Sequence, residues 1–395
     1  MSTHKPAVAL TLSTMAFAIA FAVWGIIAPM AKTFQVNLGL TEKQAWLLIA
    51  VPVLLGSVGR IPMGMLTDRF GGRAVFSALL LFIAIPAFMS SLAHTYAEFL
   101  FWGLLLGFAG TSFSIGIAFT SRWYPPEKQG LALGIYGAGN IGQSVALFGV
   151  PLLANVWGWQ NAYRLFALMA SVWGIVFLLF ARNAPVKSQP KSFGAMLKVL
   201  ATEPLSWLLS LFYFVTFGGF VALSIGLPKL LQEIFLLTKE DAGLRTAGFV
   251  VIATAMRPIG GWLSDRLGGA KVLAMVFTAA GLLAWGLTIE HIVPFTIGAL
   301  GVAAAIGTGN GAVFKLVPQY FPQDVGTVTG LVGAMGGLGG FFPPIVLGYI
   351  KTYTGAYDLG FALLSAFCFA CLVLNYRVFL YGARQAQQLT VNASK

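Results

Sequence analysis

Long apolar runs alternate with short polar segments along the whole chain, and this pattern predicts its secondary structure. Each run is long enough for a helix to cross a hydrocarbon core about 30 Å thick. We predict twelve spans, at residues 7–31, 41–66, 74–93, 97–122, 130–156, 161–181, 203–231, 241–264, 270–289, 292–320, 325–350 and 357–381. The alternation typical of barrel strands is absent from the sequence. The pattern therefore predicts an all-α membrane protein with twelve transmembrane helices.

One basic stretch that contains Pro and Ser, residues 182–198, separates six predicted spans from six. We predict an N-terminal six-helix bundle at 1–182, a cytoplasmic linker at 183–202 and a C-terminal six-helix bundle at 203–395. With a cytoplasmic N-terminus, the inner loops and tails carry about twice as many Lys and Arg residues as the outer loops, which obeys the positive-inside rule. Both termini are then cytoplasmic, and the expected location is the cytoplasmic (inner) membrane.

Composition supports this class and disfavours several others. The chain is 58% hydrophobic and 9% charged, whereas a soluble domain is about a quarter charged. The net charge of +12 is spread over loops, so no nucleic-acid partner is expected. Cys368 and Cys371 lie inside an apolar span, which favours ordinary packing over a disulfide or metal site. We expect no metal and no cofactor. An enzyme is disfavoured because no nucleophile–base pair is found.

A segment of seventeen residues occurs twice, as Gly59–Val75 and as Met256–Val272. Arg60 and Asp68 of the first copy match Arg257 and Asp265 of the second. Similar residues also begin the fifth and eleventh spans, so the chain reads as two parallel repeats of six spans. A binding site at the interface of such repeats is a known transporter plan.

The duplicated arginines lie deep in the predicted membrane. Arg60 precedes Asp68, at the expected cytoplasmic end of span 2, by eight residues, or about 12 Å of helix. Arg257 stands in the same relation to Asp265. Burying an arginine there costs at least about 2.5 kcal/mol, and every acidic residue falls at a span end or in a loop. We therefore expect both arginines to bind an anion from outside, because a guanidinium presents a planar fork of donors to oxyanions.

Glycines crowd spans 5 and 11, at residues 130–151 and 326–344. The spacing of Gly137, Gly139 and Gly142 fits a dinucleotide fingerprint formally, but that motif requires a preceding strand and a following acid, which are absent here. Small residues in a membrane span favour close helix packing and sliding. We assign such a packing or gating role to Gly137, Gly139, Gly142, Gly333, Gly336 and Gly337. Asn140, within this glycine face, is a candidate hydrogen-bond donor to the anion.

Charged residues at two short glycine turns are candidates for gating rather than for substrate binding. These residues are Asp68, Arg69, Arg73, Asp265 and Arg266. Lys315, near the inner end of span 10, is expected to snorkel to the membrane surface, although a role in ion coupling stays open. Tyr213, Phe113 and Phe217 lie in mid-span, where most aromatic side chains face lipid or core.

Two of these patterns resemble a known family. The Gly64–Arg73 turn resembles the signature loop of the major facilitator superfamily. The buried arginines, together with the Gly137–Gly142 segment, resemble its nitrate/nitrite porter family, which has glycine-rich signatures in spans 5 and 11. The resemblance covers essentially the whole chain, and it implies two six-helix bundles that work by alternating access.

The resemblance also implies roles for particular residues. In that family the arginines of spans 2 and 8 bind the anion, and these correspond to Arg60 and Arg257. The signature asparagine corresponds to Asn140. Aromatic residues that line the site correspond to Tyr213 and Phe217 of span 7 and Phe113 of span 4. Asn310, between two glycines of span 10, also matches the family pattern.

The predicted function is secondary transport of nitrate, nitrite or both, by a protein that functions as a monomer in the lipid bilayer. No acidic residue lies in mid-membrane, so the sequence offers no obvious proton carrier. Nitrate/nitrite exchange is therefore the simplest mechanism, although some family members are thought to use proton symport. Transport of another small anion and a non-transporting nitrate sensor stay open as alternatives.

Overall fold

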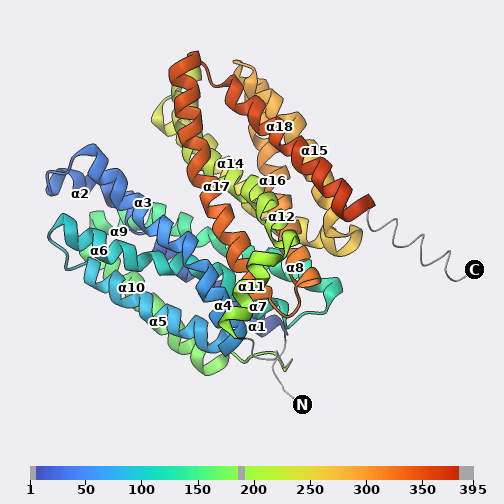
Figure 1. The fold of residues 1–395 in the computed structure, drawn as a ribbon. Helices are drawn as coiled ribbons and strands as arrows, with labels where there is room; N and C mark the ends of the chain where they lie inside the picture. Colours follow the sequence, from blue (N-terminus) through green and yellow to red (C-terminus); the bar gives the residue numbers. More distant parts are fainter. Residues whose placement is uncertain (1–5, 186–191, 382–395) are drawn as a thin grey trace, which may run out of the picture. The chain divides into compact units, whose positions relative to one another are not determined.

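The computed structural model describes residues 6–185 and 192–381. The described chain is helical throughout and contains no strand. Within it, 11 helices are long and apolar enough to cross a membrane, or up to 12 if one bent pair counts as a single span. The boundaries lie within a few residues of the predicted spans, except at the bent second span. Figure 1 follows the helices from α1 in blue to α18 in red.

The helices that precede the linker are α1 (Pro6–Trp24), α2 (Ala31–Asn37), α3 (Glu42–Val58), α4 (Arg60–Phe70), α5 (Gly72–Ser90), α6 (Tyr96–Leu106), α7 (Ser112–Ser121), α8 (Pro126–Gly137), α9 (Ile141–Trp157) and α10 (Trp159–Phe180). Short 3₁₀ turns link some of them, at η1 (Ala28–Met30), η2 (Gly107–Thr111) and η3 (Ala138–Asn140).

The remaining helices are α11 (Phe193–Thr202), α12 (Pro204–Tyr213), α13 (Gly219–Phe235), α14 (Lys239–Leu267), α15 (Gly269–Ala284), α16 (Ile292–Tyr320), α17 (Val325–Thr354) and α18 (Asp358–Asn375). A 3₁₀ turn, η5 (Trp285–Thr288), follows α15, and π-helical turns occur at η4 (Phe214–Gly218) and η6 (Tyr376–Tyr381).

The second span is bent by 40° between its parts at 50–58 and 60–70. The break falls at Gly59, and Pro52 lies about two turns earlier in α3. Both residues are common at helix kinks, because proline removes one backbone hydrogen bond of the helix and glycine restricts the backbone little. Arg60 is consequently the first residue of α4. The buried arginine therefore lies directly at the bend, on its α4 side.

Two helix connections depend on a glycine with positive φ. Gly71, between α4 and α5, has φ of 84°, and Gly268, between α14 and α15, has φ of 89°. A side chain strongly disfavours this backbone conformation, whereas glycine adopts it readily. The two positions are equivalent in the sequence repeat. The repeat therefore preserves the same tight turn in both halves of the chain.

The chain forms two compact units, and their boundaries do not coincide with the predicted linker. The first unit comprises residues 1–125, 135–207 and 320–334, and the second comprises 126–134, 208–319 and 335–395. Helix α17 therefore begins in the first unit and continues in the second. The two six-helix bundles predicted on either side of the linker remain a prediction of the repeat pattern.

Each unit has its own apolar packing. In the first, α10 lies along α5, and α1 packs against α9 and α10. In the second, α15 packs against α18, and α13 packs against α14. Part of the predicted linker forms the short helix α11, in which Met196 and Leu200 are buried while Leu197 is exposed. This helix was not expected from the sequence of the linker.

Candidate functional site

Arg60 is buried in the first unit, with only 1% of its surface exposed. Its Nε donates a hydrogen bond to the carbonyl oxygen of Gly110 at 3.0 Å. One terminal nitrogen donates to the carbonyl oxygen of Gly333 at 2.8 Å. The carbon at the centre of the guanidinium lies 5.6 Å from the ring centroid of Phe113. Backbone carbonyls and an aromatic ring therefore orient this charge.

Phe113 belongs to an aromatic cluster around Arg60 that the sequence analysis did not recognise. The Phe113 ring lies 5.5 Å from Phe17 and 6.2 Å from Tyr136. The hydroxyl of Tyr136 donates to the carbonyl oxygen of Ser112 at 2.8 Å. Phe17 and Tyr136 come from helices α1 and α8, so no spacing in the sequence could have joined them to Arg60.

Asn140 is 8% exposed and lies at η3, where the regular helix is interrupted between α8 and α9. Its Nδ2 has no hydrogen-bond partner among the described residues. A Cβ on Gly139 would lie 2.5 Å from the Phe17 ring, and one on Gly142 would collide with the carbonyl oxygen of Ala18. The glycines thus let the fifth span approach α1 closely, while Asn140 keeps an unsatisfied donor.

Arg257 occupies the equivalent position in the second unit and is 2% exposed. Its surroundings differ from those of Arg60, because the central guanidinium carbon lies 5.4 Å from the Phe217 ring and 5.5 Å from the Phe220 ring. Each distance falls within the range of a cation–π interaction. Phe220 follows Phe217 by three residues, so helical periodicity in the sequence could have identified it.

Tyr213 and Phe217 stack in parallel, with ring centroids 4.9 Å apart and an interplanar angle of 2°. The π-helical turn η4 begins directly after Tyr213 and contains Phe217, and such turns are often found at functional sites. A Cβ on Gly336 would lie 3.2 Å from the Phe217 ring and would collide with Tyr213. The absence of a side chain at position 336 therefore leaves room for the stacked pair.

Asn310 lies in α16 and is 3% exposed. Neither Nδ2 nor Oδ1 has a hydrogen-bond partner among the described residues. Phe314 lies one helical turn later on the same face, and its ring packs against Tyr213 at 4.6 Å. The amide of Asn310 thus belongs to the face of α16 that meets the aromatic residues beside Arg257.

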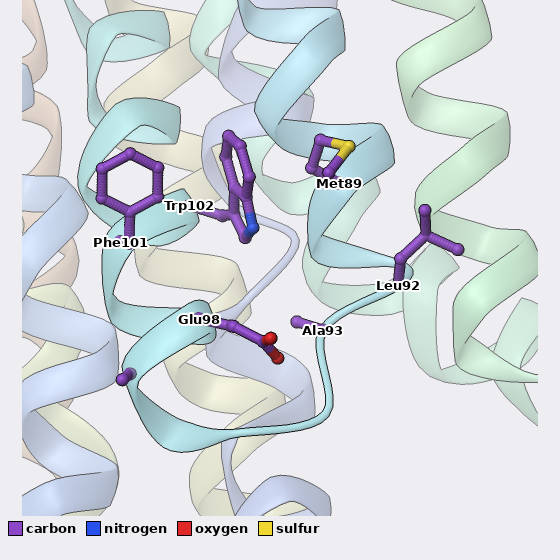
Figure 2. Close-up of a pocket in the computed structure, with 7 residues that line it drawn as sticks. Met89, Leu92, Ala93, Glu98, Phe101 and Trp102 are labelled. Atoms are coloured by element: carbon purple, nitrogen blue, oxygen red, sulfur yellow. The ribbon is translucent and has the colours of Figure 1, made fainter.

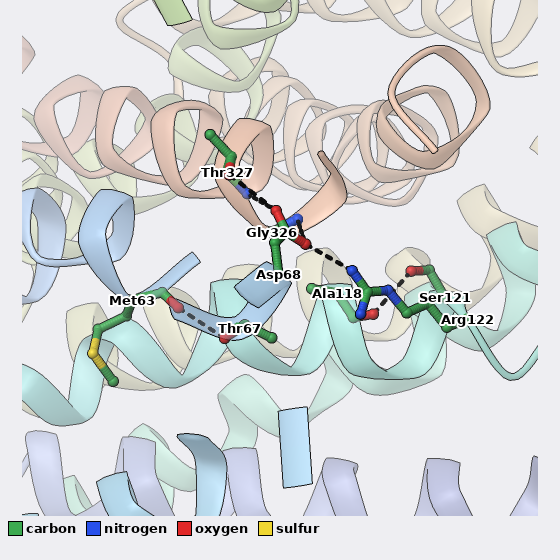
Figure 3. A network of polar contacts seen from close by, with 8 residues as sticks. All are labelled: Met63, Thr67, Asp68, Ala118, Ser121, Arg122, Gly326 and Thr327. Atoms are coloured by element: carbon green, nitrogen blue, oxygen red, sulfur yellow. Dashed lines mark hydrogen bonds and ion pairs between the residues drawn. The ribbon is translucent and has the colours of Figure 1, made fainter. Parts of the chain in front are cut away.

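Asp68 makes a cap at the beginning of α17 (Figure 3). Its carboxylate accepts hydrogen bonds from the backbone N–H groups of Gly326 at 3.0 Å and Thr327 at 2.7 Å. Arg122, which follows the last residue of α7, forms an ion pair with the same carboxylate at 2.9 Å. The first N–H groups of a helix have no partner within the helix, so a carboxylate there is stabilising. A Cβ on Gly64, one turn earlier, would collide with the carbonyl oxygen of Gly326.

Asp265 makes the repeat-equivalent contact in the second unit, but with the second turn of α8 rather than with its first residues. It accepts hydrogen bonds from the N–H groups of Gly130 and Leu131, each at 2.8 Å. The ammonium of Lys315 lies 2.6 Å from the same carboxylate and also contacts the carbonyl oxygen of Pro126. Lys315 is only 7% exposed. The prediction that Lys315 snorkels to the surface is therefore wrong, because a buried carboxylate holds its charge.

The other charged residues assigned to the turns lie close in sequence to Asp68 or Asp265. The guanidinium of Arg69 lies 4.7 Å from the Phe193 ring, and that of Arg266 lies 4.2 Å from the Trp262 ring. Arg73 donates to the carbonyl oxygen of Leu178. Two remaining glycines lie on the helices already described: Gly137 ends α8 and Gly337 lies in α17.

The structure therefore groups the expected residues within each unit. The first unit brings together Arg60, Phe113 and Gly333. The second unit brings together Arg257, Phe217, Tyr213 and Gly336. Asp68 and Asp265 make two further contacts, each between a carboxylate, two backbone N–H groups and one basic side chain.

Comparison with known proteins places the chain in a family. The model of the Major Facilitator Superfamily matches residues 13–316 and 209–392. The chain belongs to the Major Facilitator Superfamily. The predicted fold class is confirmed by solved structures of other members, which are similar at low sequence identity. One is the human organic anion transporter MFSD10 (TETRAN), with a TM-score of 0.77, 16% identity, and coverage of 94% of this chain and 100% of the other.

The fucose:proton symporter FucP of E. coli gives the same TM-score of 0.77 at 17% identity, over 95% of this chain and 99% of its own.

Relatives with higher sequence identity have names that refer to nitrate or nitrite. The chain is 40% identical to the "Nitrite extrusion protein" of Bacillus subtilis (strain 168) over 94% of both chains. It is 38% identical to the "Probable nitrate transporter NarT" of Staphylococcus epidermidis, over 94% of this chain and 96% of the other. These relatives confirm the resemblance predicted from the arginines and the glycine-rich spans.

Proposed function

We propose that this member of the superfamily is a secondary transporter that moves nitrate, nitrite or both across the cytoplasmic membrane by alternating access. One observation carries the proposal: equivalent positions of the two repeats hold arginines that are 1% and 2% exposed. Burial of a permanent charge is costly in a membrane protein and usually marks a functional site. The names of the relatives support nitrate or nitrite as the anion.

We infer that both arginines bind the anion during transport. The guanidinium of Arg60 is oriented by two backbone carbonyls, which fixes the direction of its remaining donors. Arg257 lies against aromatic faces, and these present flat surfaces on which a planar anion can stack. The amide donors of Asn140 and Asn310 would add hydrogen bonds that specify an oxyanion. The Tyr213 hydroxyl is a further candidate donor.

The contacts of Asp68 and Asp265 suggest how anion binding is linked to a change of state. Asp68 caps the start of α17, and Asp265 accepts hydrogen bonds from the second turn of α8. Such contacts can be made in one conformation and broken in another. An anion neutralises the positive charge of the arginines, so the loaded protein can close more readily than the empty one. Exchange of nitrate for nitrite follows from this preference, and the protein would act as a monomer.

The experiment is transport into proteoliposomes that contain the purified protein. Uptake of labelled nitrate is measured with nitrite inside or absent, and with a proton gradient imposed or collapsed. We expect internal nitrite to accelerate uptake and the proton gradient to have little effect. Stimulation by the gradient alone would instead support proton symport.

Two further outcomes address the alternatives. Strong inhibition by other small anions, with weak inhibition by nitrite, would indicate a different substrate. Binding of nitrate with no uptake under any gradient would contradict transport and favour a sensor. Where a transport assay compares the wild type with a lysine substitution of Arg60, an Arg245→Lys variant is the control, because Arg245 pairs with Asp241 on an exposed part of α14.

A further inference from the structure

A hollow of about 420 Å³ lies at one end of α5 and α6, well apart from the buried arginines in sequence (Figure 2). The turn at 91–95 connects these helices, and the distribution of basic residues predicts that it faces the outer side of the membrane. The residues of the hollow that matter here are Met89, Leu92, Ala93, Glu98, Phe101 and Trp102. The hollow therefore opens where lipid headgroups meet acyl chains.

Glu98 is the one charged residue among those that line the hollow. Its carboxylate accepts hydrogen bonds from the backbone N–H groups of His94 at 2.7 Å and Thr95 at 3.0 Å. The bond from Thr95 and a return bond from the Glu98 N–H to the Thr95 hydroxyl form a capping box at the start of α6, so the carboxylate is held in place. Figure 2 shows it on the same side of the helix as the Trp102 indole. A carboxylate beside an aromatic ring is suited to a cation.

The chemistry of the lining favours an ammonium group over a metal ion. Ca²⁺ requires about six to eight oxygen ligands, whereas the side chains that line this hollow supply a single carboxylate. A primary ammonium needs only a hydrogen-bond acceptor and a polarisable face, which Glu98 and Trp102 provide. A quaternary ammonium has no N–H group to donate to the carboxylate, so it fits less well.

A second charge flanks the same turn. Nε of Arg164 in α10 donates to the Ser91 hydroxyl oxygen at 3.2 Å, and Ser91 adjoins Leu92 of the hollow. Arg164 itself is exposed. Leu92 and Phe101 are 42% and 54% exposed. The helices around this turn thus present an acid, a guanidinium and apolar side chains. These groups match, in the same order, the ammonium, the phosphate and the acyl chains of a zwitterionic lipid.

We propose that this hollow binds the headgroup of an outer-leaflet phospholipid that carries a primary ammonium, namely phosphatidylethanolamine. The ammonium lies between the Glu98 carboxylate and the Trp102 indole, and the phosphate lies toward Arg164. Leu92 and Phe101 contact the acyl chains.

The test is native mass spectrometry of the full-length protein in detergent, with equimolar dioleoyl phosphatidylethanolamine and dioleoyl phosphatidylcholine. We expect the wild type to retain the ethanolamine lipid about fivefold more often, since such a contact contributes about 1 kcal/mol. Glu98→Gln should remove this preference while keeping the helix cap, because glutamine also completes a capping box. Trp102→Leu should reduce it.

Glu290→Gln is the matched control. Glu290 is exposed in the turn before α16, which is the repeat equivalent of the turn before α6, and it does not line the hollow. This variant should keep the lipid preference. Equal retention of both lipids by the wild type would overturn the proposal, as would an unchanged preference in a folded Glu98→Gln variant.

Discussion

Arg60 and Arg257 occupy equivalent positions in the repeat, yet different groups stabilise them. Backbone carbonyls of Gly110 and Gly333 accept hydrogen bonds from Arg60, whereas the rings of Phe217 and Phe220 pack against Arg257. Hydrogen bonds fix both the position and the orientation of a guanidinium. Aromatic faces fix mainly its position. The two arginines are therefore expected to respond differently to substitution.

Arg60→Lys tests the importance of the planar fork. Lysine keeps the positive charge but loses the paired geometry that contacts both carbonyls, so the remaining donor cannot be aimed at the anion. We expect apparent nitrate affinity to fall by about tenfold or more, the equivalent of about 1.5 kcal/mol or more for a charged hydrogen bond. Uptake by proteoliposomes at varied nitrate concentrations measures the change. Near-normal affinity in this variant would count against direct ligation.

Asn140→Ala separates a binding role from a structural one. The Nδ2 of Asn140 has no partner among the described residues, so its removal should leave the thermal unfolding temperature nearly unchanged. Nitrate affinity should fall about fivefold to tenfold, because one hydrogen bond contributes about 1 kcal/mol. A large loss of stability with unaltered affinity would show instead that the amide supports the helix break at η3.

At the scale of helices, glycine contacts determine how closely two elements approach. The Gly64–Gly326 contact brings α4 against the start of α17, directly beside the Asp68 cap. The repeat places Gly261 against Gly130 in the same way, beside the contact of Asp265 with α8. Each of these carboxylate contacts therefore depends on a neighbouring position that has no side chain. A conformational change that breaks such a contact also separates the two backbones.

Gly64→Ala should weaken the state in which α4 and α17 touch. The added methyl group would overlap the Gly326 carbonyl, and overpacking of this kind costs about 1–3 kcal/mol. We expect slower nitrate exchange and a changed accessibility of residues near the cap, measured by the rate of labelling of an introduced cysteine. Gly149→Ala is the control, because nothing lies within 4 Å of a Cβ at that position. Equal effects of both variants would refute the role of this contact.

At the scale of the whole molecule, the orientation in the membrane follows from the loop charges. The turn before α6 is predicted to be outside and the turn before α8 inside. His94 is exposed in the first of these turns, and Lys128 is exposed in the first turn of α8, directly after the second. The native Cys368 and Cys371 are both 0% exposed, so they should react little with a polar reagent.

His94→Cys and Lys128→Cys test this orientation. A membrane-impermeant maleimide added to intact spheroplasts should label the His94→Cys variant, and it should label the Lys128→Cys variant only after permeabilisation. The wild type gives the background. The opposite pattern of labelling would reverse the predicted topology and place both termini outside.

The sequence by itself determined the helical class, the approximate spans and the equivalence of the two halves. Membrane thickness imposes the length of each apolar run, and a repeat is found by comparing the chain with itself. The arginines at 60 and 257 could also be found in this way, since a charge stands out in an apolar span. Asn140 could be picked out within the glycine-rich fifth span, and the family resemblance then supplied site roles for Tyr213, Phe217 and Phe113.

Only the tertiary structure decided which groups contact one another. The bend at Gly59, the π-helical turn that contains Phe217 and the packing of Phe17 and Tyr136 against Phe113 have no clear pattern in the sequence. Asp68 caps a helix whose start lies far along the chain, and Lys315 is buried against Asp265 rather than exposed. Hydrophobic patterns record burial in membrane or core, but they do not identify a partner. Partners are set by how distant helices pack, because only packing brings their polar groups within bonding distance.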